Sequence, residues 1–242
     1  MASKDLRAFL AEFIGTFALV FVGSAAVWVS SQTGYAGGPL VPAFAHGLVV
    51  VFAAYSLGHI SGALLNPAVT LAAAIAGGID WARAGIYVVV QLVAGILAAL
   101  LLNALLIGQG GLRPAAQFGA FSYNALYVNS IGALFVEAVL TFLLAFVVLQ
   151  AAVKGRAGNL AGLVVGLTLA GVILAGGALT GASLNPARSL GPALIAGDLS
   201  QIWIYLIGPV LGGGLAAIVS SSLIEPSKSE PTPPKKNTGR RT

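Results

Sequence analysis

The stretch GALLNPA at residues 62–68 decides the fold, because it returns as GASLNPA at residues 181–187. Asparagine is a favoured helix N-cap, and proline fits the first helical position, where its missing N–H costs nothing. Each Asn-Pro-Ala triplet therefore predicts the start of a helix. Glycines end the two helices after about ten residues, at Gly77 and at Gly197. Each helix is then about 15 Å long, which is half of a hydrocarbon core of about 30 Å.

The composition indicates a protein that lies in a lipid bilayer. Apolar residues make up 58% of the 242 residues and charged residues only 8%, which excludes a soluble globular protein. Glu12 and the length of the first apolar stretch argue against a cleaved signal peptide. Six stretches are long enough to span a bilayer, at about residues 8–30, 41–60, 83–107, 129–153, 160–177 and 201–223.

The positive charges predict the orientation in the membrane. If six spans alternate, most cations fall on one side, and only Arg113 and Arg188 fall on the other. Because positively charged loops stay in the cytoplasm, both termini are expected there, and the net charge of +5 does not indicate a nucleic-acid partner. The tail at residues 225–242 is polar and proline-rich, which predicts a disordered cytoplasmic segment. The chain has no cysteine, so no disulfide or thiolate metal site is available.

The chain is an internal duplication with inverted topology. Glu12 in the first span returns as Glu137 in the fourth, within a similar local pattern. Each repeat, at about residues 8–107 and 129–223, holds three spans, so the second copy enters the membrane from the opposite face. The two short helices then meet at mid-membrane, where irregular backbone is tolerated only beside protein or a wet cavity. The expected fold is an all-α polytopic membrane protein of six transmembrane helices plus two half-helices, in one domain at residues 1–224.

These motifs together resemble those of the aquaporins, or major intrinsic proteins. The likeness extends from AEFIGT at residues 11–16 to GP at residues 208–209. It is most specific at HISG (residues 59–62), NPAVT (residues 66–70) and NPARS (residues 185–189). The resemblance implies a right-handed helix bundle, a homotetramer and one pore through each protomer.

The half-helices predict how such a pore discriminates between solutes. Their N-terminal ends each carry about half an elementary positive charge, and both point at mid-membrane, where they repel cations. If the side-chain oxygens of Asn66 and Asn185 cap the helices, their NH2 groups are held in place and can donate to a passing molecule. One such asparagine alone would be read as a simple cap, but two converging copies favour pore lining. The predicted lining set is Asn66, Pro67, Ala68, Asn185, Pro186 and Ala187, with the non-helical backbone of Gly62, Ala63, Leu64, Gly181 and Ser183.

Two carboxylates in the spans, Glu12 and Glu137, need polar partners, because an unpaired charge inside a membrane costs several kcal/mol. The N–H groups of the two loops are available. The resemblance implies that both carboxylates brace these loops, and Gln91 is a further anchor. Thr16 and Thr141 are expected to hydrogen-bond between packed helices. A proton relay is the alternative, and the absence of an intramembrane histidine or lysine chain between the carboxylates disfavours it.

Arg188 is the strongest functional candidate, because an arginine in a half-helix that begins at mid-membrane must face an aqueous lumen or a partner. In the family that is resembled, this arginine belongs to a selectivity filter, and the spacing assigns the other filter positions to His46, Ile173 and Ala182. This set resembles the filter of the plant tonoplast intrinsic proteins, some of which pass ammonia as well as water. A core histidine bonded to a backbone carbonyl is the alternative for His46. The resemblance puts His59 at the pore mouth, with a loop brace as the alternative.

The expected function is passive conduction of water without protons or ions, with ammonia or hydrogen peroxide as further solutes. Glycerol facilitation is the alternative. Ser189 and Ala193 resemble the residues of water channels at these positions, but Leu206 resembles the residue of glycerol facilitators. An ion-coupled transporter would need a polar ion-binding cluster, and a membrane scaffolding protein would need no filter arginine. No catalytic triad or metal-ligand cluster is apparent in the sequence, so no enzyme, metal or cofactor is expected. Short loops and a short N-terminal segment favour a bacterial inner membrane.

Overall fold

The computed structural model describes residues 2–32, 36–106 and 121–222, and within them six helices are long and apolar enough to cross a membrane. The expected tail at 225–242 and Arg113 lie outside the described residues. The predicted fold class is confirmed. The six long helices are α1 (Ala2–Ser30), α2 (Leu40–Ser61), α4 (Trp81–Leu105), α5 (Ser130–Val147), α6 (Ala161–Thr180) and α8 (Ile202–Ser222).

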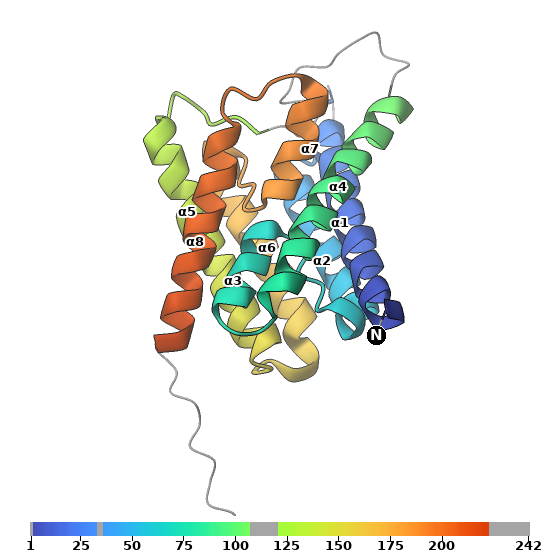
Figure 1. Cartoon of the computed structure of the whole chain (residues 1–242). Helices are drawn as coiled ribbons and strands as arrows, with labels where there is room; N and C mark the ends of the chain where they lie inside the picture. The colour runs from blue at the N-terminus through green and yellow to red at the C-terminus, as the bar shows by residue number, and fades with distance from the viewer. Residues whose placement is uncertain (1, 33–35, 107–120, 223–242) are drawn as a thin grey trace, which may run out of the picture.

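Two short helices begin at the repeated triplets, as predicted. They are α3 (Pro67–Ile75) and α7 (Pro186–Ala196), and in both the proline holds the first helical position. The Asn66 side chain accepts a hydrogen bond from the backbone N–H of Ala68 at 2.9 Å, and Asn185 caps α7 in the same way. Both short helices lie between the long helices, with α3 in the half of the bundle nearer the N-terminus and α7 in the opposite half (Figure 1).

The start of α1 and the end of α8 lie at the same end of the bundle (Figure 1). Six crossings of a bilayer return the chain to the side from which it started, so this arrangement agrees with six spans. Below, this end is called the terminal end and the other is called the far end.

Glycines allow the helices to approach closely at their crossings. Gly47 on α2 meets Gly166 on α6, where a Cβ on either residue would lie 2.5 Å from the carbonyl oxygen of the other. On α8, a Cβ on Gly213 would lie 2.8 Å from the carbonyl oxygen of Ala68 in α3. Lipid supplies no hydrophobic force between helices, so such close van der Waals packing holds a membrane bundle together.

The helix that contains α5 does not end as a regular α-helix. Its last turn, Val148–Val153, is a π-helix, and a short 3-10 helix, Gly158–Leu160, precedes α6. The wider turn carries Val153 toward the end of α3, where a Cβ on Gly78 would lie 2.7 Å from its Cγ1. The π turn therefore brings an apolar side chain to the terminal end of the space between the helices.

Gly47→Ala is expected to destabilise the fold by about 1–3 kcal/mol, because the added methyl overlaps the backbone of α6 and not a movable side chain. Thermal unfolding of the purified protein in detergent measures the effect. Gly85→Ala is the matched control, since a Cβ on Gly85 meets no atom within 4 Å. Equal unfolding midpoints for the two variants would contradict the proposed tight crossing of α2 and α6.

Candidate functional site

The two loops that precede α3 and α7 share an unusual backbone. Residues 62–65 and 181–184 are not helical, and they contain non-glycine residues with positive φ, a conformation that costs about 1–2 kcal/mol for each L-residue. The φ angles are +95° at Gly62, +48° at Ala63, +55° at Leu65, +80° at Gly181, +49° at Ala182 and +58° at Leu184. Other interactions must therefore hold these loops in place.

Glu12 holds the first loop with four hydrogen bonds. Its Oε1 accepts from the Ser61 hydroxyl at 2.7 Å and from the Leu64 N–H at 3.0 Å. Its Oε2 accepts from the Leu65 N–H and from the Gln91 side-chain amide, both at 2.8 Å. An ionised carboxylate has about four acceptor positions, so these donors fill it.

Glu137 holds the second loop in the same manner but with fewer donors. Its Oε1 accepts from the Thr180 hydroxyl at 2.7 Å and from the Ser183 N–H at 3.0 Å, and its Oε2 accepts from the Leu184 N–H at 2.8 Å. Glu12 and Glu137 are both fully buried. The structure thus places both carboxylates and Gln91 against the loops that they are expected to brace.

Two tyrosines also hold the ends of the helices that lead into these loops, and the sequence analysis did not predict this role. The Tyr87 hydroxyl donates to the Ser61 carbonyl at 3.1 Å, and the Tyr205 hydroxyl donates to the Thr180 carbonyl at 2.9 Å. The two tyrosines hold equivalent places in the two repeats. This repetition is the signal that could have identified them, since each accepting residue ends a long helix directly before a loop.

The expectation for Thr16 and Thr141 is wrong. Both hydroxyl groups are buried and have no hydrogen-bond partner among the described residues. The polar group beside Gln91 is instead Thr70 of α3, whose hydroxyl accepts from Nε2 of Gln91 at 2.9 Å. The hydrogen bond therefore runs from a long helix to a half-helix, and not between two long helices as expected. The spacing of residues within the long helices does not predict where a half-helix lies.

The two capping asparagines bind across the site to the opposite loops. Nδ2 of Asn66 donates to the Leu184 carbonyl at 2.8 Å, and Nδ2 of Asn185 donates to the Leu65 carbonyl at 2.9 Å. An amide NH2 carries two hydrogens, so each side chain keeps one donor after this bond. The reciprocal pair joins the two repeats where the half-helices meet.

Arg188 lies at the N-terminal turn of α7 and is only 3% exposed. Its Nε donates to Nε2 of His46 at 2.6 Å, and its Nη1 donates to the carbonyls of Ala182 at 2.6 Å and Ser183 at 3.1 Å. Its Cζ lies 4.3 Å from the centre of the Phe121 ring, which gives a cation–π contact. Phe121 comes from the connection before α5, and no sequence pattern indicated its position.

His46 uses both ring nitrogens within the protein. Nδ1 lies 2.5 Å from the Pro42 carbonyl and must donate to it, so Nε2 is the acceptor for Arg188. The neutral ring with its hydrogen on Nδ1 satisfies both bonds. The structure thus gives His46 the carbonyl bond of the core-histidine alternative together with a place beside Arg188.

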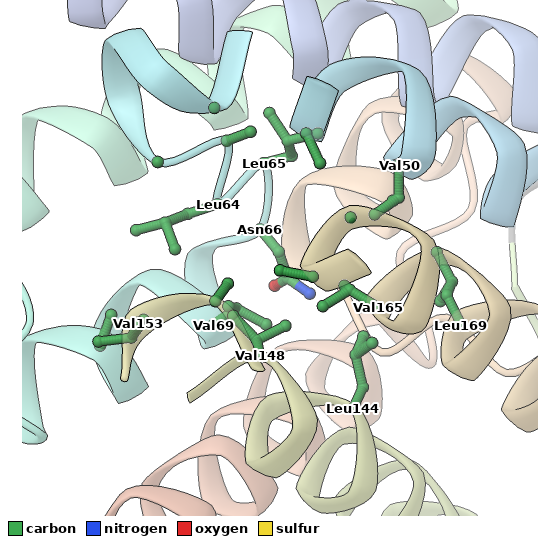
Figure 2. A pocket seen from close by; sticks show the side chains of 18 of the residues that line it. Val50, Leu64, Leu65, Asn66, Val69, Leu144, Val148, Val153, Val165 and Leu169 are labelled. Atoms are coloured by element: carbon green, nitrogen blue, oxygen red, sulfur yellow. The ribbon is translucent and has the colours of Figure 1, made fainter. Parts of the chain in front are cut away.

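A cavity of about 780 Å³ extends from the terminal end to these two side chains. His59 and Asn159 line it near the terminal end, and His46 and Arg188 line its inner end. Figure 2 shows the amide of Asn66 among labelled lining side chains that are otherwise hydrocarbon. Those apolar side chains are Val50, Leu64, Leu65, Val69, Leu144, Val148, Val153, Val165 and Leu169.

The structure brings part of the expected lining set to this cavity. The residues on its wall are His46, His59, Gly62, Ala63, Leu64, Asn66, Ser183, Asn185 and Arg188. The residues placed away from its wall are Pro67, Ala68, Ile173, Gly181, Ala182, Pro186 and Ala187. Ala68 and Ala187 pack against glycines of α8 and α4, and Ile173 and Ala182 share a buried apolar cluster.

Six bilayer-length helices around two half-helices that meet at mid-depth, with a cavity inside a single chain, define a membrane channel fold built from inverted repeats. The sequence matches the family described as Major intrinsic protein over residues 1–220. The chain therefore belongs to the major intrinsic protein family, as its motifs predicted, and it is an integral membrane protein of a passive channel family.

Relatives in this family come from plants, bacteria and a parasite. The chain is 40% identical over 240 residues to "Probable aquaporin TIP3-2" of Arabidopsis thaliana, covering 94% of this chain and 87% of that protein. It is 40% identical over 215 residues to "Glycerol uptake facilitator protein-like 6" of Lactiplantibacillus plantarum, covering 88% and 95% of the two chains. The structure of an aquaglyceroporin from Plasmodium falciparum matches with a TM-score of 0.81 at 27% identity, covering 90% of this chain and 96% of that one.

Glu12→Gln is expected to lower the free energy of unfolding by about 1–3 kcal/mol, because the new NH2 group opposes at least one loop donor and leaves it unpaired. Thermal unfolding in detergent measures the loss. Thr16→Val, one turn away on α1, is the control, since the hydroxyl that it removes has no partner among the described residues. A Glu12→Gln variant as stable as Thr16→Val would contradict the bracing role.

Proposed function

We propose that this protein is a passive water channel whose selectivity filter contains Arg188. The observation that carries the proposal is a line of polar groups along an otherwise apolar cavity wall. Asn66, Asn185 and Arg188 contribute donors to this line, and most of the other side chains that line the cavity are hydrocarbon. Water needs hydrogen-bonding partners on one side only, and an apolar wall opposite them holds no molecule tightly enough to stop flow.

The donors left over in the structure are those that face a solute in the proposed mechanism. Each asparagine keeps one N–H after its bond to the opposite loop, and Arg188 keeps the two N–H groups of Nη2. A water oxygen accepts from both asparagines at mid-depth, so its own hydrogens point outward in both directions. This orientation interrupts the hydrogen-bonded chain along which a proton would move.

Cations are excluded by charge. Within residues 2–32, 36–106 and 121–222, no carboxylate forms a salt bridge with Arg188. The positive ends of α3 and α7 add to the field of this guanidinium, because both half-helices begin at mid-depth. Glu12 and Glu137 are occupied by loop donors, which argues against a role as ion ligands in a coupled transporter.

The size of the solute is set at the inner end of the cavity. A volume of about 780 Å³ has room for many water molecules, each of which occupies roughly 30 Å³. The proposed narrow step is beside His46 and Arg188, which form the inner end of the cavity. Ammonia and hydrogen peroxide are proposed as additional solutes from the filter set expected from the sequence, although its members Ile173 and Ala182 lie away from the wall of this cavity.

Glycerol conduction is the second candidate. It is favoured by the large, mostly apolar cavity and by the names of two relatives, a glycerol uptake facilitator-like protein and an aquaglyceroporin. Ser189 argues for water. Its hydroxyl contacts that of Ser183 beside the filter, and position 189 therefore offers no acidic group to bind a polyol.

Flux through proteoliposomes tests the proposal. Stopped-flow light scattering is expected to record fast water flow with a low activation energy, and internal alkalinisation is expected to record ammonia entry. Arg188→Val is expected to raise glycerol flux relative to water flux by about tenfold, the effect of about 1.4 kcal/mol in the barrier. The matched control is Arg156→Val, which removes an exposed arginine that does not line the cavity.

Each outcome of this experiment supports or overturns one of the two candidate functions. Rapid water flow with a small glycerol flux supports the water channel, and glycerol flux comparable to water flux in the natural protein supports the second candidate. Water flow no faster than that through empty liposomes would overturn both. An unchanged flux ratio in Arg188→Val would remove Arg188 from the filter.

The proposed assembly and orientation follow from the family resemblance and from charge. A homotetramer keeps four separate pores, because the cavity is enclosed by one chain. Native mass spectrometry is expected to find four copies. Lys4 and Lys154 are at the terminal end, which is proposed as the cytoplasmic side of a bacterial inner membrane. A green fluorescent protein fused at the C-terminus is expected to fluoresce, and loss of fluorescence with normal expression would reverse the orientation.

A further inference from the structure

Gly23 on α1 is placed directly against the ring of His46. A Cβ on Gly23 would overlap Nε2 of that ring and would lie 2.6 Å from both Cδ2 and Cε1. Nε2 is also the atom that accepts the hydrogen bond from Nε of Arg188. The missing side chain at position 23 therefore creates the space that the ring occupies when it binds the arginine.

The ring has little freedom to move elsewhere within the protein. It is 1% exposed, and it is held by the Pro42 carbonyl on one side and by Arg188 on the other. The open space next to it is the cavity, of which His46 forms part of the inner end. Any side chain at position 23 would thus push the ring toward the cavity and away from Arg188.

The second repeat has a different pair of residues at the equivalent places. Val148 follows Glu137 by eleven residues, as Gly23 follows Glu12, and Val165 precedes Asn185 by twenty residues, as His46 precedes Asn66. Val148 and Val165 both line the cavity (Figure 2). A matched pair of valines in one half corresponds to a glycine and a histidine in the other, so the absence of a side chain at position 23 compensates for the larger ring at position 46.

We propose that Gly23 is a specificity-determining position of the channel, which acts by seating His46 and, through it, Arg188. This inference rests on the proposed function and assigns to it a residue that does not touch the solute. With glycine at position 23, the ring lies against α1 and accepts the hydrogen bond that holds the arginine to one side. With a larger residue there, the ring enters the passage and the arginine loses an acceptor.

The test compares Gly23→Ala with Gly171→Ala in proteoliposomes. A Cβ on Gly171 meets no atom within 4 Å, so this control adds the same methyl group to a transmembrane helix without a contact. Gly23→Ala is expected to lower water flux about tenfold and to lower glycerol flux further, while Gly171→Ala conducts as the natural protein does. Equal fluxes in the two variants would overturn the inference.

A double variant separates displacement of the ring from general damage to helix packing. His46→Ala removes the ring, so adding Gly23→Ala to it is expected to change flux less than twofold. A double variant that is still about tenfold slower than His46→Ala would mean that the methyl group disturbs the packing of α1 itself, and it would overturn the role assigned to Gly23. Thermal unfolding of all four proteins follows the same cycle and detects a contact between the two positions independently of flux.

The failure of the proposed function is distinguishable from the failure of this inference. If the natural protein conducts neither water nor glycerol, the proposed function is overturned and the specificity role with it. If the natural protein conducts but Gly23→Ala matches Gly171→Ala, only the role of Gly23 is overturned.

Discussion

The core of a bilayer contains no water, and this constraint governs the two loops on which the rest of the structure depends. Residues 62–65 and 181–184 leave helical geometry at mid-depth, where an unpaired backbone N–H or C=O costs several kcal/mol. Left-handed conformations at intervals along each loop turn successive N–H groups to one side, which makes a nest for an anion. Glu12 and Glu137 occupy the two nests, and their bonds hold a backbone that would otherwise relax.

The same geometry determines what faces the cavity. Because the N–H groups of a nest point at its carboxylate, the carbonyl groups of the loop point the other way. The carbonyls of Leu65 and Leu184 meet the asparagine of the opposite half-helix, and those of Ala182 and Ser183 hold Arg188. Each repeat thus completes the loop of the other. The position of the arginine depends on a carboxylate that it does not contact, through the peptide groups between them.

Local signals in the sequence were sufficient for the fold, because a capping asparagine, a following proline and an odd number of spans in each repeat act over short distances along the chain. They predicted the half-helices, the inverted repeat and the family. They could not predict side-chain contacts that depend on the rotation of each helix about its axis relative to its neighbours. The bond from Gln91 to the half-helix and the bond between His46 and Arg188 belong to this class, as does the hydroxyl of Thr16, which has no partner among the described residues. Phe121 reaches the arginine from a connection whose path no periodic pattern determines.

The two repeats differ in how many hydrogen-bond donors surround the buried carboxylate. Gln91 gives Glu12 a fourth donor, but the equivalent place in the second repeat, four residues after Tyr205, is Pro209, whose side chain donates nothing, so Glu137 has three. Arg188 lies on this less well satisfied side. The peptide group between Ala182 and Ser183 donates its N–H to Glu137, and its carbonyl, that of Ala182, accepts from the guanidinium, so one short hydrogen-bonded chain links anion to cation. Such a chain strengthens each of its bonds. In the proposed channel the arginine therefore acts in two directions, because it stabilises a buried carboxylate behind the loop and presents a positive charge to any cation that enters the cavity.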